Sequence, residues 1–404
     1  MIRFWITNLP LNHGNMSNKS LIQSRLIGML LRYGVVTRPE CVRELGVRAA
    51  SLLEAIDTLK QEGLVQEPER QGKRTGRKAP RLVLSPDYLW CVGVDFQEDK
   101  VVGVVSDMGG EVRHEAIARG GRRRNAEECW QEILSVIEEL RRKCGANWSL
   151  VKGIGFADPG LVDMAKGISL RAVNLPGWQN VQTRAVLEKR SGLPVGLWPE
   201  CAVSTYMEYL QRGRNLQGSL FYLGMGTGIG GGYIRDGECF FGDHNLAMEV
   251  GHIVVNPNGP LCQCGNRGCL EAIAGRNGIF RRIQETLASG VNTSLELSHF
   301  SLAKFTECVR ADKAAHVIAN EICESIGCAL STVVTLLNPS CIVLRGELVG
   351  LGALLLDTVK RVLTANCFPA ALEHLRLEIS TLAPVDTARG AALMMRNRLL
   401  AAAR

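Results

Sequence analysis

The sequence lacks a long hydrophobic run, and its first residues lack the parts of a secretion signal. No segment reaches the roughly 18 consecutive apolar residues that a membrane-spanning helix needs. Residues 1–10 are apolar, but they contain neither a long hydrophobic stretch nor a small-residue cleavage site. We therefore expect no signal peptide and no membrane insertion.

Cysteine pairs at regular spacing are also missing outside one short segment. Of the 14 cysteines, most are scattered, as at Cys41, Cys91, Cys144 and Cys308. Scattered cysteines without a signal peptide are typical of reduced thiols in the cytoplasm. With 404 residues, 46% of them hydrophobic and 22% charged, the chain is too long for one ordinary domain. We expect a cytoplasmic globular protein of two or three domains.

Net charge is absent from most of the chain. Residues 87–404 hold 33 basic and 33 acidic side chains, whereas residues 1–86 hold 14 basic and 7 acidic ones. The whole excess of +7 therefore lies in the first fifth of the sequence. Such asymmetry favours an acidic partner for that segment, nucleic acid first, over a merely solvated basic face.

The basic segment has the pattern of three helices. Apolar residues recur at helical spacing over residues 19–33. Thr37 and Glu40 form a capping-box pattern that starts a second, short helix ending at Gly46. A third helix is predicted over residues 48–62.

Two short strands, at 64–65 and 81–84, flank a basic loop over residues 72–80. Three helices followed by a basic hairpin predict a winged helix-turn-helix DNA-binding domain over residues 1–86. A helical dimerisation or docking module is the alternative. The candidate DNA contacts lie at the start of the third helix and in the wing, namely Arg48, Ser51, Lys73, Arg74, Arg77 and Lys78.

From residue 89 onward, apolar strand-like runs alternate with helical patterns. The runs at 90–95 and 101–105 precede a helical stretch at 127–143, and the alternation restarts at 219–223. This pattern predicts an α/β fold.

One histidine and three cysteines are close in sequence, in the order His252, Cys262, Cys264 and Cys269. One imidazole and three thiolates are enough to close a tetrahedral structural zinc site. Chance clustering in a cysteine-rich chain and a redox role are the alternatives.

The neighbours of this cluster are Glu249-Val-Gly-His252 on one side and Cys264-Gly-Asn-Arg-Gly-Cys269-Leu-Glu271 on the other. This pattern resembles the signature of the ROK family, which groups sugar kinases with sugar-responsive transcriptional repressors. The segments at 157–163, 174–178 and 224–232 resemble the family's sugar-facing loop and phosphate loop. The resemblance covers essentially the whole chain.

The resemblance implies a two-lobed, actin-like ATPase fold over residues 89–404. Lobe one would span about 89–200 and lobe two about 201–404, and we leave open a return of the C-terminal helix to lobe one. It also implies structural Zn²⁺ on His252 and the three cysteines of the cluster. Sugar contacts would come from Asn174, Glu200, Glu249, His252 and Glu271.

Two of these assignments have alternatives. Glu249 and Glu271 could serve only to support the zinc loop. The glycine-rich segment around Gly226, Thr227 and Gly228 could be an ordinary hairpin, with its return strand near Tyr233.

Three elements that a ROK kinase needs are altered here. Gln97 stands where the first phosphate site, after Asp95, should have glycine. Pro199-Glu200 replaces the Asn-Asp pair that carries the catalytic base, so Glu200 occupies that position with a longer side chain. Arg345-Gly346-Glu347 replaces a later Gly-Gly turn. We expect no catalytic residues, no enzyme activity and a degenerate phosphate loop at Gly226–Gly228.

The third helix also departs from the family's regulators, which carry hydroxyl and basic residues at its exposed start. Here Leu53 and Glu54 occupy such positions, and Glu54 either accepts a hydrogen bond from cytosine or is simply solvated.

We interpret the chain as a DNA-binding regulator that senses a sugar or sugar derivative. The resemblance implies that it assembles as a homodimer or higher homo-oligomer, and that it acts as a repressor, since repression is the commoner mode in the family. The alternatives are a sugar kinase fused to a DNA-binding domain, and a pseudo-sensor that docks a protein inducer such as a phosphotransferase-system protein.

Overall fold

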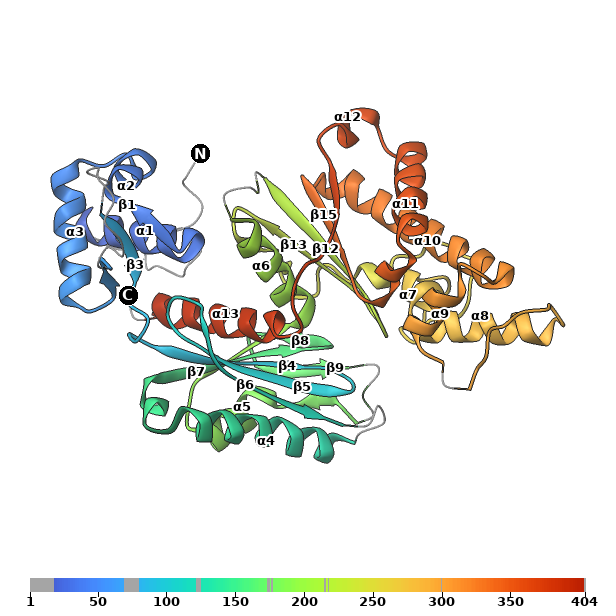
Figure 1. Cartoon of the computed structure of the whole chain (residues 1–404), viewed down its shortest axis with the longest axis horizontal. Coiled ribbons are helices and arrows are strands. Elements are labelled where there is room, and N and C mark those ends of the chain that lie inside the picture. The colour runs from blue at the N-terminus through green and yellow to red at the C-terminus, as the bar shows by residue number, and fades with distance from the viewer. Residues whose placement is uncertain are drawn as a thin grey trace. The chain divides into compact units, whose positions relative to one another are not determined.

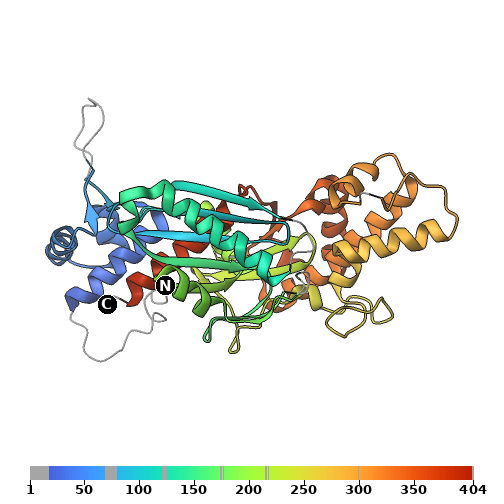
Figure 2. The ribbon, with the colours of Figure 1, turned by 90° about the horizontal axis from the view of Figure 1, so that it is seen from below.

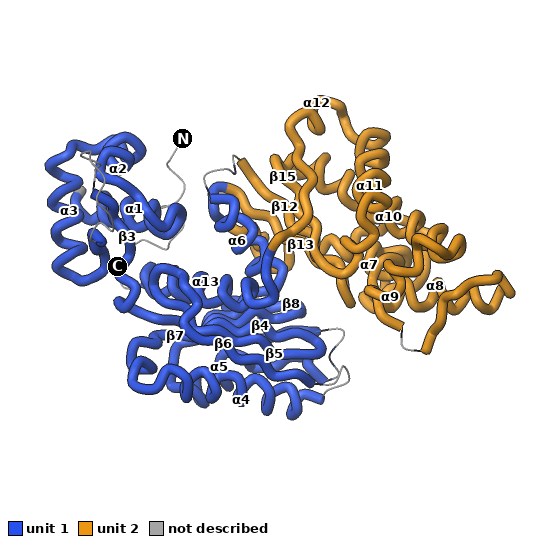
Figure 3. The backbone as a smooth tube through the Cα atoms, in the orientation of Figure 1, with its two compact units in different colours: residues 1–216, 236–238, 382–404 blue, residues 217–235, 239–381 orange. Residues whose placement is uncertain are grey.

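The computed structural model describes residues 18–68, 80–120, 125–172, 175, 177–213, 216, 218–298 and 300–402. It divides into two compact units (Figure 3). Unit 1 comprises residues 1–216, 236–238 and 382–404, and unit 2 comprises residues 217–235 and 239–381. The C-terminal helix therefore belongs to the same unit as the first half of the chain.

The first part of unit 1, residues 18–84, is a small helical module that we call the N-terminal module. Its three strands form an antiparallel sheet in the order β1-β3-β2. Its elements are α1 (Asn18–Tyr33), β1 (Val35–Thr37), α2 (Arg38–Leu45), α3 (Ala49–Gln61), β2 (Val65–Gln66) and β3 (Arg81–Leu84).

Local sequence explains the boundaries of α2. The Thr37 backbone N–H donates to Glu40 Oε2 at 2.7 Å, and the Glu40 N–H donates back to the Thr37 hydroxyl, so the predicted capping box is confirmed. Gly46 ends the helix in the left-handed conformation, with φ of 64°, as glycine does at low cost. Strand β1 was not predicted, because its three residues show no alternation of their own and pair only with the distant β3.

The rest of unit 1 is built on a five-stranded mixed sheet in the order β11-β7-β4-β5-β6. Strands β4, β7 and β11 are parallel, and β5 and β6 run antiparallel to their neighbours. The strands are β4 (Trp90–Phe96), β5 (Lys100–Ser106), β6 (Val112–Arg119), β7 (Val151–Asp158) and β11 (Val195–Pro199). A small separate sheet contains β8 (Leu161–Asp163), β9 (Ile168–Arg171) and β10 (Gln179–Val181).

Helices cover both faces of the five-stranded sheet. In Figure 1, α4 and α5 lie on one face and α13 lies on the other, and Figure 2 shows α4 running along the outside. These helices are α4 (Ala126–Cys144), which continues into the 3-10 turn η1 (Gly145–Leu150), α5 (Thr183–Ser191), α6 (Glu200–Arg212) and α13 (Asp386–Ala402).

Helix α13 lies against β4 and β7 because glycines on the strands leave room for its backbone. A Cβ added to Gly93 would come within 1.8 Å of the Ala388 carbonyl oxygen, and one on Gly155 within 1.9 Å of that of Ala391. Arg396 of the same helix is buried and donates to the Met108 carbonyl at 2.9 Å. The C-terminal helix is thus an integral part of the unit 1 core.

The N-terminal module is joined to the rest of unit 1 by a shared core. One hydrophobic cluster contains Leu26 and Leu82 of the module together with Met108, Met395 and Leu400. The connection to β4 is tied down, because the Met108 N–H donates to the Pro86 carbonyl at 3.1 Å.

Unit 2 is built on a second five-stranded sheet, in the order β14-β13-β12-β15-β16. Its strands are β12 (Ser219–Met225), β13 (Ile229–Arg235), β14 (Glu238–Cys239), β15 (Cys341–Arg345) and β16 (Arg376–Ile379). Its helices are η3 (Val250–His252), α7 (Leu270–Ala274), α8 (Arg276–Ala288), α9 (Leu302–Cys308), α10 (Lys313–Leu337), η4 (Glu347–Leu351), α11 (Ala353–Asn366) and α12 (Pro369–Leu372).

Helix α10 is, within the described ranges, the one helix long and apolar enough to cross a membrane by length and composition alone. In the structure, 61% of its most apolar window is buried. Its buried residues, among them Ile318, Ile322 and Ile326, belong to the core of unit 2. Its apolar character is therefore accounted for by packing.

Candidate functional site

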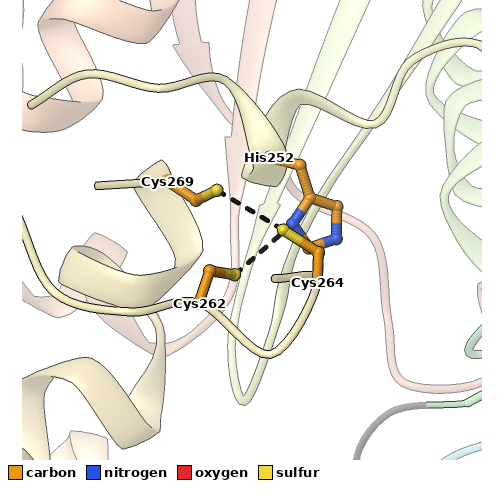
Figure 4. A group of neighbouring side chains, drawn as sticks. All are labelled: His252, Cys262, Cys264 and Cys269. Atoms are coloured by element: carbon orange, nitrogen blue, oxygen red, sulfur yellow. Dashed lines mark hydrogen bonds between the residues drawn. The ribbon is translucent and has the colours of Figure 1, made fainter. Parts of the chain in front are cut away.

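Four side chains of unit 2 converge on one point (Figure 4). The ligand atoms of His252, Cys262, Cys264 and Cys269 all lie within 4.8 Å of one another. His252 Nδ1 is 3.7 Å from Cys262 Sγ, and Cys264 Sγ is 3.6 Å from Cys269 Sγ. With Zn–S bonds of about 2.3 Å, a tetrahedron has edges of about 3.8 Å, so the donor set and its size fit a metal such as zinc.

A tight backbone turn builds this cluster. The Cys262 N–H donates to the Asn266 carbonyl at 2.7 Å, and Leu261 and Arg267 form a bridge across the turn. Gly265, with φ of 98°, closes the turn. Gly268 has a positive φ as well, and a Cβ there would lie 1.5 Å from the Asn256 carbonyl oxygen. The turn that brings the cysteines together therefore requires glycine at these two positions.

Glu249 and Glu271 flank the cluster and influence each other. Solvent reaches Glu249, yet the protein around it removes part of its hydration, and this effect, together with the Glu271 carboxylate, raises the pKa of Glu249 to about 7. Glu271 Oε2 accepts a hydrogen bond from the Ile229 N–H at 2.8 Å. Glu271 therefore links the start of α7 to the glycine-rich turn that precedes β13.

The glycine-rich segment is a hairpin whose return strand is β13, earlier in the sequence than expected. Met225 pairs with Ile229, so Gly226, Thr227 and Gly228 form the turn itself. The Gly226 N–H donates to the Gly228 carbonyl at 3.0 Å. The hairpin interpretation is therefore correct in geometry, and the candidate phosphate loop is reduced to these three residues.

A carboxylate stands beside this turn. A Cβ added to Gly226 would lie 3.2 Å from Glu347 Oε2, which begins η4 directly after the altered turn at Gly346. Gly346 itself must be glycine, because its φ is 107° and a Cβ would meet the Met225 carbonyl at 1.9 Å. A negative charge at this place disfavours a phosphate at the turn.

In unit 1, the two candidate kinase elements are occupied by the chain's own side chains. The Gln97 side-chain amide donates to the buried Asp95 Oδ2 at 2.5 Å. Glu200, the first residue of α6, accepts a hydrogen bond from the Ser204 hydroxyl at 2.6 Å and one from the Cys201 thiol at 3.4 Å. Glu200 thus belongs to unit 1, whereas Glu249, His252 and Glu271 belong to unit 2. The fifth sugar-contact candidate, Asn174, lies outside the described residues.

Asp158 is a buried residue that sequence reasoning did not single out. It ends β7 beside Pro199 and accepts hydrogen bonds from the Gly160 N–H at 2.9 Å, from Trp178 Nε1 at 3.3 Å and from the Ser169 hydroxyl. Burial raises the pKa of its carboxyl group. A lone carboxylate within an apolar strand pattern was the available signal. Asp158 holds the start and the end of the predicted sugar-facing loop together.

Only part of the predicted DNA-contacting set falls on described residues. Arg48 directly precedes α3 and is exposed, and Ser51 is half-buried in its first turn. The wing candidates Lys73, Arg74, Arg77 and Lys78 lie outside the described residues. Sequence reasoning missed Glu67, which follows β2 and pairs with Arg38 at 2.6 Å and with Lys60 at 3.4 Å.

The chain is similar to known proteins over most of its length. The family model of the ROK family matches residues 91–398. The chain belongs to the ROK family. Relatives that match about nine-tenths of the chain include transcriptional repressors. The xylose repressor of Caldicellulosiruptor bescii is 25% identical over 369 residues, which are 90% of this chain and 92% of that repressor. The DNA-binding transcriptional repressor Mlc of Escherichia coli is 24% identical, over 92% of this chain and 91% of its own length.

ROK kinases match a smaller share of the chain. The glucokinase of Thermotoga maritima is 28% identical over 77% of this chain and 98% of its own length. Among solved structures, a ROK family transcriptional regulator described as a homolog of Escherichia coli Mlc has a TM-score of 0.76 at 23% identity, over 91% of this chain and 92% of its own. The glucokinase of Streptomyces griseus has a TM-score of 0.64 at 24% identity, over 76% of this chain and 98% of its own. The actin-like ROK fold predicted for the C-terminal region is confirmed.

Proposed function

We propose that this ROK protein is a cytoplasmic DNA-binding transcriptional regulator of carbohydrate metabolism, acting as a repressor, whose C-terminal region senses a sugar or sugar derivative. The observation that carries the proposal is the N-terminal module, whose three helices and three-stranded sheet precede the ROK domain. Regulators that match about nine-tenths of the chain support it.

The N-terminal module would bind operator DNA as the described part of a winged helix-turn-helix domain over residues 1–86. Its order of helices and strands and its three-stranded sheet suit this architecture. In such a domain the helix after the turn, here α3, enters the major groove, and the wing follows the phosphates or the minor groove. Arg48, Ser51 and the four basic residues of the wing are the proposed contacts.

Residues 89–404 would form the sensing domain. Asn174, Glu200, Glu249, His252 and Glu271 are the proposed sugar contacts, with carboxylates and an imidazole suited to accept hydrogen bonds from hydroxyl groups. Zn²⁺ on His252, Cys262, Cys264 and Cys269 would act structurally, by fixing the loop that presents Glu249 and Glu271. If Nδ1 of His252 faces the metal, its other ring nitrogen is left for a sugar hydroxyl.

Regulation requires that the effector bind two states of the protein differently. The N-terminal module shares a hydrophobic core with α13, so a rearrangement of that core would alter how the module meets DNA. In a homodimer, which we propose by analogy with the family, such a change would alter the fit of two modules to two operator half-sites.

A sugar kinase fused to a DNA-binding domain is the second candidate, favoured by the match with the Thermotoga maritima glucokinase. Against it stand the hydrogen bond between Gln97 and Asp95, the Glu347 carboxylate beside the Gly226 turn, and Glu200 at the position of the base. A pseudo-sensor that responds to a protein inducer, such as a phosphotransferase-system protein, is the third.

In the first step of the test, the zinc-loaded full-length protein is mixed with fragments of the source genome, and the fragments that it binds are recovered. Binding of a recovered duplex is then titrated with xylose, glucose, N-acetylglucosamine and their phosphates. One sugar should lower DNA affinity at least tenfold, and Glu271→Gln should abolish that response while DNA binding and zinc content persist. Glu285→Gln on α8 is the matched control, because Glu285 is exposed and its ion pair with Arg281 lies on the helix surface, away from the cluster.

Release of ADP from ATP in the presence of the same sugar would favour the kinase instead. If the protein binds DNA but no sugar changes its affinity, the result would favour the pseudo-sensor that responds to a protein inducer.

A further inference from the structure

The outward face of α3 begins with apolar side chains. Leu52, Ala55, Ile56 and Leu59 face the module's core. On the opposite side, the exposed residues of the helix are Ala49, Ala50, Leu53, Glu54, Asp57, Lys60 and Gln61. Leu53 keeps 38% of its surface exposed and is one of the exposed large hydrophobic residues of the chain. In a helix that enters the major groove, residues near the N-terminus contact the base edges.

Base edges in the major groove are almost entirely polar. Guanine, adenine and cytosine present only hydrogen-bond donors and acceptors, and the thymine C5-methyl group is the one apolar feature. An apolar side chain placed against a polar edge removes water without replacing its hydrogen bonds, which is unfavourable. The same side chain placed against a thymine methyl group buries apolar surface from both partners.

We propose that Ala50 and Leu53 contact thymine methyl groups, so that the operator half-site of this protein carries thymines opposite these two residues. This inference rests on the proposed DNA-binding function. The two residues are one helical turn apart, and three residues advance a helix by about 4.5 Å. Base pairs are spaced by about 3.4 Å. The two methyl groups therefore belong to neighbouring base pairs.

The charge of residues 1–86 as a whole supports DNA as the occupant, and the charges on α3 itself favour its N-terminal end as the contact. All of the chain's net positive charge lies in residues 1–86, which favours a polyanion over an apolar protein partner. Glu54 and Asp57 come next along the exposed face, and their carboxylates repel phosphate. From Glu54 onward, contact with the DNA backbone is therefore disfavoured, and base contact falls to the residues before Glu54, near Arg48.

The experiment removes single methyl groups. Duplexes are selected from a random pool with the zinc-loaded full-length protein, and each thymine of the selected site is then replaced by deoxyuridine, which lacks only the C5-methyl group. Two neighbouring positions per half-site should each lose about fourfold in affinity, the value of one buried methyl group. Deoxyuridine outside the half-sites should leave the affinity unchanged.

A protein variant tests whether Leu53 is the residue that contacts one of the thymine methyl groups. Leu53→Ala should weaken binding to the thymine site and abolish the effect of deoxyuridine at one of the two positions. Leu21→Ala is the matched control, because Leu21 of α1 has the same exposed fraction of 38% and lies outside the helix-turn-helix pair. It should keep both deoxyuridine effects.

The outcomes separate this inference from the proposed function. A selected duplex that binds equally well with every thymine replaced overturns the thymine assignment and leaves the DNA-binding function intact. If no sequence is enriched from the pool, the proposed function fails, and the exposed face of α3 must serve a protein contact.

Discussion

The side-chain amide of Gln97 donates a hydrogen bond to Oδ2 of Asp95 over 2.5 Å. Asp95 is buried at the end of β4, at the position where a ROK kinase would begin its first phosphate site. Gln97 occupies the position of the glycine that would leave room for a phosphate there. One oxygen of this buried carboxylate is thus held by a neighbouring side chain of the same turn.

The first prediction concerns this pair. Gln97→Ala removes a donor from a buried carboxylate and should lower the free energy of unfolding by about 1–3 kcal/mol, as measured by urea denaturation. Asp99→Ala, in the same turn but exposed, should change stability by less than about 0.5 kcal/mol. Equal stabilities of the two variants would show that Gln97 has no such role.

The second prediction concerns the metal. The purified protein should contain about one zinc ion per chain, and Cys264→Ser should lose it and melt at a lower temperature, because metal binding is coupled to folding. Cys328→Ser is the control, since Cys328 is exposed on α10, outside the cluster. Elemental analysis and a thermal melt give the readout. Unchanged zinc content in Cys264→Ser would rule out the assigned ligand set.

The third prediction concerns stability in acid. Burial acts to raise the pKa of Asp312, but hydrogen bonds from the Ala315 and Ser294 N–H groups and from two hydroxyls outweigh it and lower that pKa to about 2. The folded pKa lies below the unfolded value of about 3.9, so Asp312 stabilises the fold above that pH. This contribution, about 2–3 kcal/mol, should vanish as the pH falls from about 4 to about 2.

Asp312→Asn should therefore be less stable than the wild type at pH 7 and should show a smaller loss of stability in that window, measured by urea denaturation at several pH values. Asp357→Asn, at an exposed position on α11, is the control. A wild-type pH profile that Asp312→Asn reproduces unchanged would contradict the account.

The fourth prediction pairs two glycines of opposite effect. Gly155→Ala places a methyl group within 1.9 Å of the Ala391 carbonyl oxygen and should displace α13, at a cost of about 3 kcal/mol. Gly28 in α1 has nothing within 4 Å, so Gly28→Ala should stabilise the protein by about 0.5–1 kcal/mol. Thermal melts of both variants test the pair. A loss of stability in Gly28→Ala would contradict the placement of Gly28 in α1 with open space around it.

The sequence predicted those features that depend on local chemistry. The capping box at Thr37, the helix end at Gly46 and the convergence of His252 with three cysteines follow from short patterns with a direct physical cause. The family resemblance supplied the two-lobed fold, which no short pattern could establish.

What the sequence could not predict depends on distant partners. Strand β1 exists because it pairs with β3, more than 40 residues away. Asp158 is held by Ser169 and Trp178 across a loop, and Glu347 lies beside Gly226, more than 100 residues earlier in the chain. In each case the residue type was visible, but its partner was not.

The most direct test of the account is the affinity of the zinc-loaded protein for its recovered operator, compared with a scrambled duplex of the same composition at about 150 mM salt. A sequence-specific regulator should bind the operator at least about 1,000-fold more tightly than the scrambled duplex. Equal affinity for the two duplexes would contradict the central claim that this ROK protein regulates transcription by reading DNA.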